Sequence, residues 1–218
     1  MNPWAEPFIV YAVLFFPGFA SSGFSSGTAG AEEAETIQFV ISQELSHILG
    51  FTVPALALIG YLLVLRGGKK RLPGSPRSGD CLSLALALPG LLGVGLLISL
   101  VSSVFSAGSS ALTVEAPRGL LAVMVMFFSC LSTGYLEEFY FRYYLSLRFK
   151  QAGLGEPFAI GLSVLLFSLC HIYEGLWGAL NAFLAGILLS LVYKKYRALH
   201  GIAWAHGFYN VFIYLNGI

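Results

Sequence analysis

The sequence has few charged residues for its length. Aspartate, glutamate, lysine and arginine make up 11% of the 218 residues, whereas a soluble domain carries roughly a quarter. Hydrophobic residues make up 57%, and the mean hydropathy is +0.79. This scarcity of charge excludes an ordinary soluble domain. The formal net charge of +1 gives no sign of a nucleic-acid or acidic partner.

Cysteine is also scarce, and neither a CxxC pair nor an HExxH sequence is present. The three cysteines, Cys81, Cys130 and Cys170, lie within or beside apolar runs. They form no even disulfide framework, and small membrane-buried side chains explain them best. No internal repeat is evident, so the chain is interpreted as one integral membrane domain over residues 1–218.

Apolar runs of roughly membrane-spanning length take up most of the chain. The runs are 7–24, 37–65, 81–105, 119–150, 157–173, 176–193 and 199–215. Pro54 could kink the second run or divide it into two segments, which would make an eighth span. The sequence therefore predicts an all-α fold, a polytopic transmembrane helix bundle of about seven spans with a central polar cavity.

The basic residues of the loops predict the orientation of this bundle. With seven spans, ten of them fall on one side, namely Arg66, Lys69, Lys70, Arg71, Arg77, Arg148, Lys150, Lys194, Lys195 and Arg197. Only Arg118 falls on the other side. Cytoplasmic loops carry the excess of Lys and Arg, so the N-terminus and basic loops are expected in the cytoplasm. The first run resembles a signal-peptide core, but no Lys or Arg precedes it, which favours an uncleaved span.

Two glutamates and an arginine lie inside one of the most apolar stretches, YLEEFYFRYYL. Glu138 and Arg142 are four residues apart, so they share a helix face and can form an ion pair. Glu137 points about 100° away. Thr133 and Gly134, stacked next to it, are small enough to leave space for water or substrate. We expect Glu137 to remain available for chemistry, with a charge cluster at a helix end as the alternative.

Two further spans each place a histidine and a partner residue on one helix face. Phe167 and His171 are four apart in FSLCH, and His206 and Asn210 are four apart in HGFYN. A lone membrane histidine is more often a helix–helix hydrogen-bond donor than a catalyst. Two of them, with an amide and the free carboxylate of Glu137, indicate a functional site. The helical rise puts these groups about 16–21 Å from the basic ends, at similar depths.

These three motifs, in this order on separate spans, resemble the EExxxR, FxxxH and HxxxN/D motifs of the CPBP family of intramembrane proteases. That family includes the CAAX-processing and bacteriocin-processing (ABI) types. The resemblance covers residues 137–210, about a third of the chain, and indicates a protease core at about 119–216. It implies a glutamic-type, metal-independent endopeptidase that needs no cofactor.

The resemblance also implies catalytic roles for four residues. Glu137 with His171 would activate the attacking water, since a carboxylate in an apolar cavity suits general-base work. His206 and Asn210 would stabilise the oxyanion of the tetrahedral intermediate by donating hydrogen bonds. These roles agree with the expectation that Glu137 is the unpaired acid.

Structural support of the site is implied for three residues of the same motifs. Glu138 and Arg142 would hold the site together, and Phe167 would pack beside His171. The aromatic residues that surround Arg142 in YLEEFYFRYYL are expected mostly to face lipid or to pack at a membrane boundary. A minority of them would line the path by which substrate reaches the site.

Two other functions remain open from the sequence. Glutamate and two histidines can ligate zinc, although each histidine sits on its own span beside a non-ligand residue. Intramembrane glutamate and histidine also build proton relays, so a non-proteolytic transporter, scaffold or immunity protein is the second alternative. For a protease, the partner would be a membrane-anchored protein or peptide: a prenylated CAAX tail, a leader peptide or a C-terminal sorting signal. The small size suggests a prokaryotic enzyme of the inner membrane.

Overall fold

The structure of the chain is a computed structural model. It describes residues 4–25, 36–37, 39–67, 72–105, 113–114 and 116–216. The acidic residues of the first loop and part of the first basic loop lie outside these described residues.

The described chain is helical, which confirms the all-α class. Its long helices are α1 (Ala5–Ser25), α3 (Val53–Gly67), α4 (Ser78–Phe105), α5 (Leu120–Glu138), α7 (Glu156–Leu169), α8 (Gly175–Tyr196) and α9 (Leu199–Asn216). Shorter segments are α2 (Ile41–His47), the π-helices η1 (Ile48–Thr52) and η3 (Phe139–Leu145), α6 (Ser146–Gln151) and the 3-10 helix η4 (Ile172–Glu174). Two strands of two residues, β1 (Thr36–Ile37) and β2 (Thr113–Val114), pair in parallel.

Four helices are long and apolar enough to cross a membrane. They are Ile41–Gly67, Ser78–Phe105, Leu120–Gln151 and Ile172–Tyr196. Ala5–Phe15 and Glu156–Leu169 are apolar but shorter. The helix through Pro54 is continuous, with a π-turn before the proline, so the described chain shows no division there. The expected count of seven spans stays a prediction.

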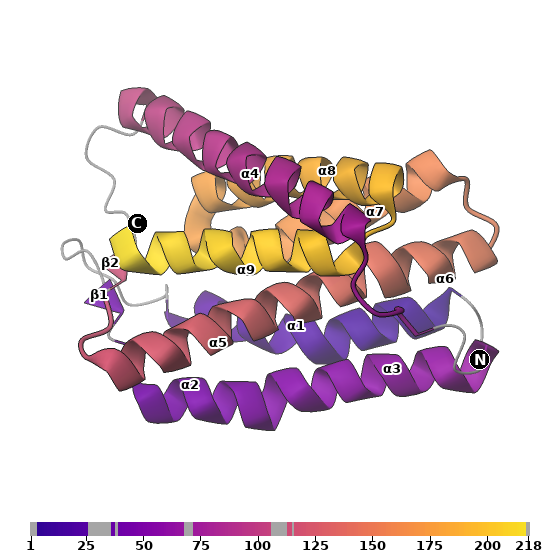
Figure 1. Cartoon of the computed structure of the whole chain (residues 1–218), viewed down its shortest axis with the longest axis horizontal. Helices are drawn as coiled ribbons and strands as arrows, with labels where there is room; N and C mark the ends of the chain where they lie inside the picture. Colours follow the sequence, from indigo (N-terminus) through magenta and orange to yellow (C-terminus); the bar gives the residue numbers. More distant parts are fainter. Residues whose placement is uncertain are drawn as a thin grey trace.

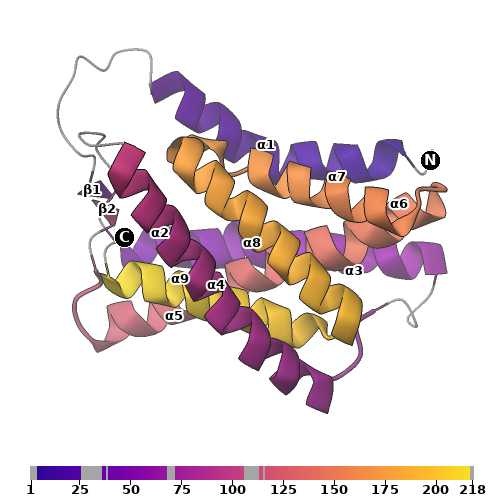
Figure 2. The same cartoon turned by 90° about the horizontal axis from the view of Figure 1, so that it is seen from above.

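The helices lie side by side, with α8 crossing α7 obliquely (Figures 1 and 2). The two chain ends lie at opposite ends of the bundle, as an odd number of passes requires (Figure 1). Arg66, Arg148 and Lys194 belong to the last turns of α3, α6 and α8, which finish at the N-terminal end of the bundle. This end, called the basic end below, matches the grouping of basic loops expected from the sequence.

The aromatic residues of η3 form the centre of the bundle rather than a lipid-facing surface. Tyr140, Phe141 and Tyr144 are fully buried. The Tyr140 hydroxyl donates a hydrogen bond to the carbonyl of Pro7 at 2.7 Å, which ties η3 to α1. Of the two roles expected for these rings, lipid contact or packing, the three buried rings have the packing role. Phe15 of α1 contacts Tyr140 and Phe141, and Phe167 of α7 contacts Phe141.

A pair of glycines sets the distance between α5 and α9. A Cβ atom added at Gly134 would lie 2.8 Å from the backbone nitrogen of Gly207 and 2.9 Å from the carbonyl oxygen of Ala203. The two backbones therefore touch at this level, one helical turn before the glutamates. Gly134 was expected to leave open space beside Glu137. Instead, its missing side chain is what lets α9 approach.

We predict that Gly134→Ala lowers the free energy of unfolding by about 1–3 kcal/mol, because the added methyl group meets backbone atoms that cannot move alone. Gly161→Ala is the matched control, since a Cβ at Gly161 in α7 meets nothing within 4 Å. That change should be neutral or slightly stabilising. Thermal unfolding of both variants in detergent measures the difference, and equal midpoints would contradict the close crossing.

Candidate active site

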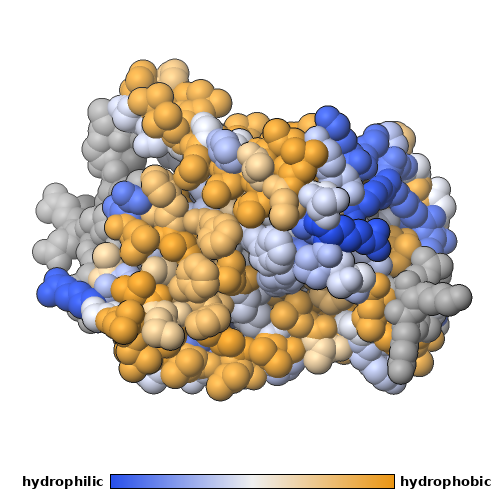
Figure 3. Space-filling view, in the orientation of Figure 1, coloured by the Kyte–Doolittle hydropathy of each residue, from blue (hydrophilic) through white to orange (hydrophobic). Residues whose placement is uncertain are grey.

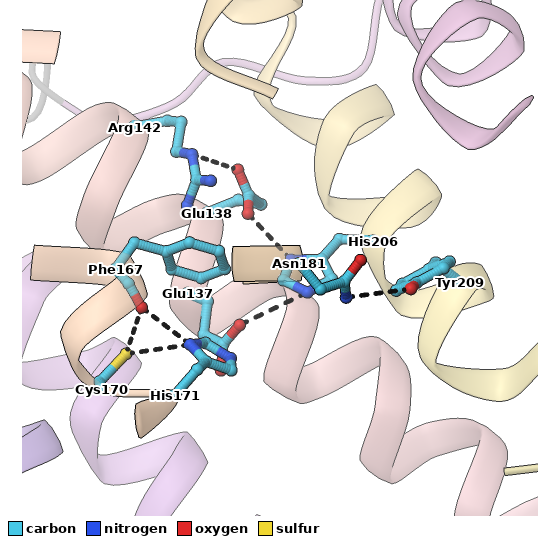
Figure 4. Close-up of polar contacts among 9 residues, drawn as sticks. All are labelled: Glu137, Glu138, Arg142, Phe167, Cys170, His171, Asn181, His206 and Tyr209. Atoms are coloured by element: carbon cyan, nitrogen blue, oxygen red, sulfur yellow. Dashed lines mark hydrogen bonds and ion pairs between the residues drawn. The ribbon is translucent and has the colours of Figure 1, made fainter. Parts of the chain in front are cut away.

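The site lies where α5, α9 and the end of α7 meet inside the bundle. The close glycine crossing brings Glu137 and Glu138, at the end of α5, next to His206 on α9. Phe167 and His171 approach from α7 and the turn that follows it (Figure 4). The sequence-predicted convergence of the three motifs is thus present in the structure for these side chains.

Glu138 is fully buried and contacts two basic groups. Its Oε2 lies 3.1 Å from Nε of Arg142, the ion pair expected from the four-residue spacing. Its Oε1 lies 2.9 Å from Nδ1 of His206, which donates a hydrogen bond to it. The sequence did not predict this second contact. Glu138 therefore orients the His206 ring as well as balancing the charge of Arg142 (Figure 4).

Glu137 lies on the other side of the same ring. Its Oε2 is 3.5 Å from Nε2 of His206, an ion-pair contact that is too long for a good hydrogen bond. Its side chain is 13% exposed, whereas that of Glu138 is 0% exposed. Oε2 of Glu137 has no hydrogen-bond partner among the described residues. Glu137 is thus the less constrained and more accessible of the two acids.

His171 lies in a turn and not on the helix that was expected to carry it. α7 ends at Leu169, and the backbone of His171 bonds to the carbonyl of Ser168. Its Nδ1 still lies 2.8 Å from the carbonyl oxygen of Phe167, four residues earlier. A carbonyl only accepts, so Nδ1 carries the proton and a neutral ring keeps a free lone pair on Nε2.

The Phe167 ring contacts the Arg142 guanidinium and both imidazole rings of the site. Its ring centroid lies 4.6 Å from that of His171 and 5.9 Å from that of His206. The guanidinium carbon of Arg142 lies 4.2 Å from the same centroid, within cation–π range. The ring fixes both histidines and replaces part of the hydration that Arg142 loses on burial.

Replacing Phe167 by leucine should lower the free energy of unfolding by about 1–2 kcal/mol, because a desolvated cation–π contact and two ring contacts are lost. Phe158→Leu is the matched control on the same helix, since Phe158 is 77% exposed and should tolerate the change. Thermal midpoints in detergent compare the two variants. A Phe167→Leu protein as stable as the control would show that the ring has no supporting role.

Asn210 is the one motif residue that the structure does not bring into contact with the others. It is half-buried on α9, and no hydrogen bond of its side chain is found among the described residues. Asn181 on α8 was missed by sequence reasoning. Its Nδ2 donates to the hydroxyl of Tyr209 at 3.2 Å, and its Oδ1 is buried without a partner in the described chain. The signal was available, because Asn181 is the only amide side chain in α8.

No group of three or more His, Cys, Asp or Glu side chains is arranged to hold a metal ion in the part of the chain that the structure describes. Glu137 and Glu138 flank His206 from opposite sides of its ring, and Nδ1 of His171 is occupied by a backbone carbonyl.

Long apolar helices around buried carboxylates and imidazoles define an integral membrane protein with an internal ionisable site. Residues 119–212 match the family described as type II CAAX prenyl endopeptidase Rce1-like. The match confirms the resemblance drawn from the motifs and leaves the N-terminal half uncovered. The match supports a CAAX-type intramembrane protease at the level of the family.

The searches of curated proteins and of solved structures returned no match for this chain.

Proposed function

We propose that the protein hydrolyses a peptide bond of a membrane-anchored protein or peptide, with Glu137 as the general base. The observation that carries this proposal is the unequal surroundings of the two adjacent acids. Glu138 is fixed by Arg142 and His206, whereas Glu137 has one long contact and a partly exposed side chain. A base needs a carboxylate that is held in place but still open to water.

His171 is the second group proposed to act on the water. Its Nδ1 proton is bound by the Phe167 carbonyl, so its Nε2 lone pair can accept a hydrogen bond. Together, Glu137 and His171 would hold one water molecule and take its proton as its oxygen attacks the substrate carbonyl.

His206 and Asn210 are proposed to stabilise the oxyanion that this attack creates. His206 faces a carboxylate through each ring nitrogen, Glu138 through Nδ1 and Glu137 through Nε2. On substrate binding, Nε2 of His206 could turn its proton from Glu137 to the oxyanion. Asn210, one helical turn further along α9, would supply a second donor.

The reaction ends when the carbon–nitrogen bond breaks. The proton taken from water passes to the leaving amine, and the products are a carboxylic acid and an amine. This sequence needs no group beyond water and the side chains of the chain. The zinc alternative and the non-proteolytic alternative each make a different prediction for the following experiment.

The test compares the termini of membrane proteins, by mass spectrometry, in cells that produce the protein and in cells that lack it. New termini that appear only with the protein would identify substrates. A peptide that spans such a site should then be cleaved by the purified protein in a strong chelator. Loss of cleavage in chelator with recovery on added zinc would support the zinc enzyme. An unchanged set of termini would support the transporter, scaffold or immunity protein.

A further inference from the structure

A narrow pocket with a cavity volume of about 20 Å³ lies between η3, α6, α7 and α8 at the basic end of the bundle. Four cations and one acid are the charged residues of its lining, namely Arg142, Lys150, Lys194, Arg197 and Glu156. Figure 3 shows a strongly hydrophilic surface over this end of α8, next to apolar surface. The pocket is separate from the side on which Glu137 contacts His206.

The mouth of this pocket has more positive than negative charge. Lys150 and Arg197 both contact Oε1 of Glu156, at 2.7 and 2.8 Å, and Lys194 lies 3.7 Å from Oε2. Hydrogen bonds from Lys150 and Arg197 lower the pKa of Glu156, just before the expected span, to about 2. The acid is therefore ionised near neutral pH, and three cations share one negative charge.

Arg142 forms the inner wall of the pocket and has unused hydrogen-bond donors. It is 2% exposed, and neither Nη1 nor Nη2 has a hydrogen-bond partner among the described residues. Its contact with Glu138 uses only Nε. Buried donors without acceptors are costly, so an acceptor that enters from the pocket would be stabilised there. Ser190, also buried, lines the same wall and offers a hydroxyl group.

The surroundings of the pocket suit a lipid. Phe158 on α7 and Leu191 on α8 are 77% and 55% exposed, so the two helices that form the pocket carry outward-facing apolar surface below it. Basic pockets between membrane helices at the cytoplasmic side bind anionic lipid headgroups. A phosphate offers several acceptor oxygens to cations that converge from different helices.

We propose that this pocket binds the phosphate of an anionic phospholipid headgroup, with the acyl chains along α7 and α8. Lys150, Lys194 and Arg197 hold the phosphate at the mouth, and the headgroup reaches toward Arg142. Since Arg142 also holds Glu138, the bound lipid would be joined to the site through one guanidinium group. This binding does not depend on the proposed proteolytic function.

Native mass spectrometry of the detergent-purified protein tests the proposal, with phosphatidylglycerol, phosphatidylcholine and inorganic phosphate as probes. We expect retention of phosphatidylglycerol over phosphatidylcholine. Lys194→Gln should reduce that retention about fivefold, and a Lys150→Gln/Lys194→Gln protein should reduce it by about 25-fold. Lys195→Gln is the matched control. It removes the same charge one residue further along α8, and Lys195 does not line the pocket.

Equal losses in Lys194→Gln and Lys195→Gln would overturn the proposal, because general attraction of the basic end would then explain the binding. Equal retention of the two lipids would overturn it as well. Retention of inorganic phosphate without retention of lipid would overturn the proposal, because the ligand of the pocket would then be free phosphate and not a lipid. Thermal midpoints equal to that of the wild type would show that the lysine variants are folded, since both lysines are partly exposed.

Discussion

The Glu137→Gln protein is expected to cleave its substrate about 100-fold to 10,000-fold more slowly than the wild type. Glutamine keeps the size and hydrogen-bonding shape of the side chain but cannot take a proton from water, and general-base catalysis contributes a factor of this order. Folding should be little affected, because Glu137 makes one long contact with His206 and its Oε2 has no other described partner. The measurement is turnover of a peptide from an identified cleavage site.

Glu44→Gln provides the control for this experiment. Glu44 is a second acid in a membrane-length helix, and it accepts a hydrogen bond from Ser129, two turns before Glu137 along α5. Its glutamine variant keeps that acceptor and should retain full turnover. Full activity in Glu137→Gln would rule out the proposed general base, whichever substrate is used.

The second large effect is expected for Glu138→Gln, on stability and not directly on chemistry. The new amide can still accept the hydrogen bond from Nδ1 of His206, but it no longer balances the charge of Arg142. Leaving one partner of a buried ion pair unpaired costs about 3–5 kcal/mol. We expect lower folded yield and a lower unfolding midpoint, measured in detergent by thermal unfolding.

A double variant separates lost charge balance from other damage. In Glu138→Gln/Arg142→Met, the stranded cation is replaced by an apolar side chain of similar length, so much of the stability should return. If the double variant is less stable than Glu138→Gln alone, the ion pair does not explain the role of Glu138. Neither variant is expected to recover full turnover, since the carboxylate that orients His206 is absent from both.

Helical spacing predicted the contacts that depend on neighbouring residues of one helix. Glu138 and Arg142 meet as the four-residue spacing indicates, and Phe167 and His171 meet for the same reason. His171 contacts Phe167, four residues earlier, even though α7 has ended before His171, because its ring bonds to the carbonyl of Phe167. Local periodicity was therefore sufficient for the pairs within each motif.

The sequence predicted that the three motifs meet, but not which atoms pair between the helices. The bridge from Glu138 to His206 depends on how closely α5 and α9 approach, which Gly134 and Gly207 decide together. One glycine in a sequence does not show whether it opens a space or admits a neighbouring backbone. Asn181 was missed for the same reason, because its partner Tyr209 lies on another helix.

The shortness of α7 has a consequence for the surrounding lipid. Its 14 residues extend about 21 Å, whereas a hydrocarbon core measures about 30 Å. The turn that follows, from His171 to Glu174, would then lie at a level normally occupied by acyl chains, which cannot hydrogen-bond to the peptide groups that the turn leaves unpaired. A bilayer that thins next to α7 relieves this mismatch. This local thinning would bring the aqueous boundary closer to His171, the imidazole that we propose to act on the attacking water.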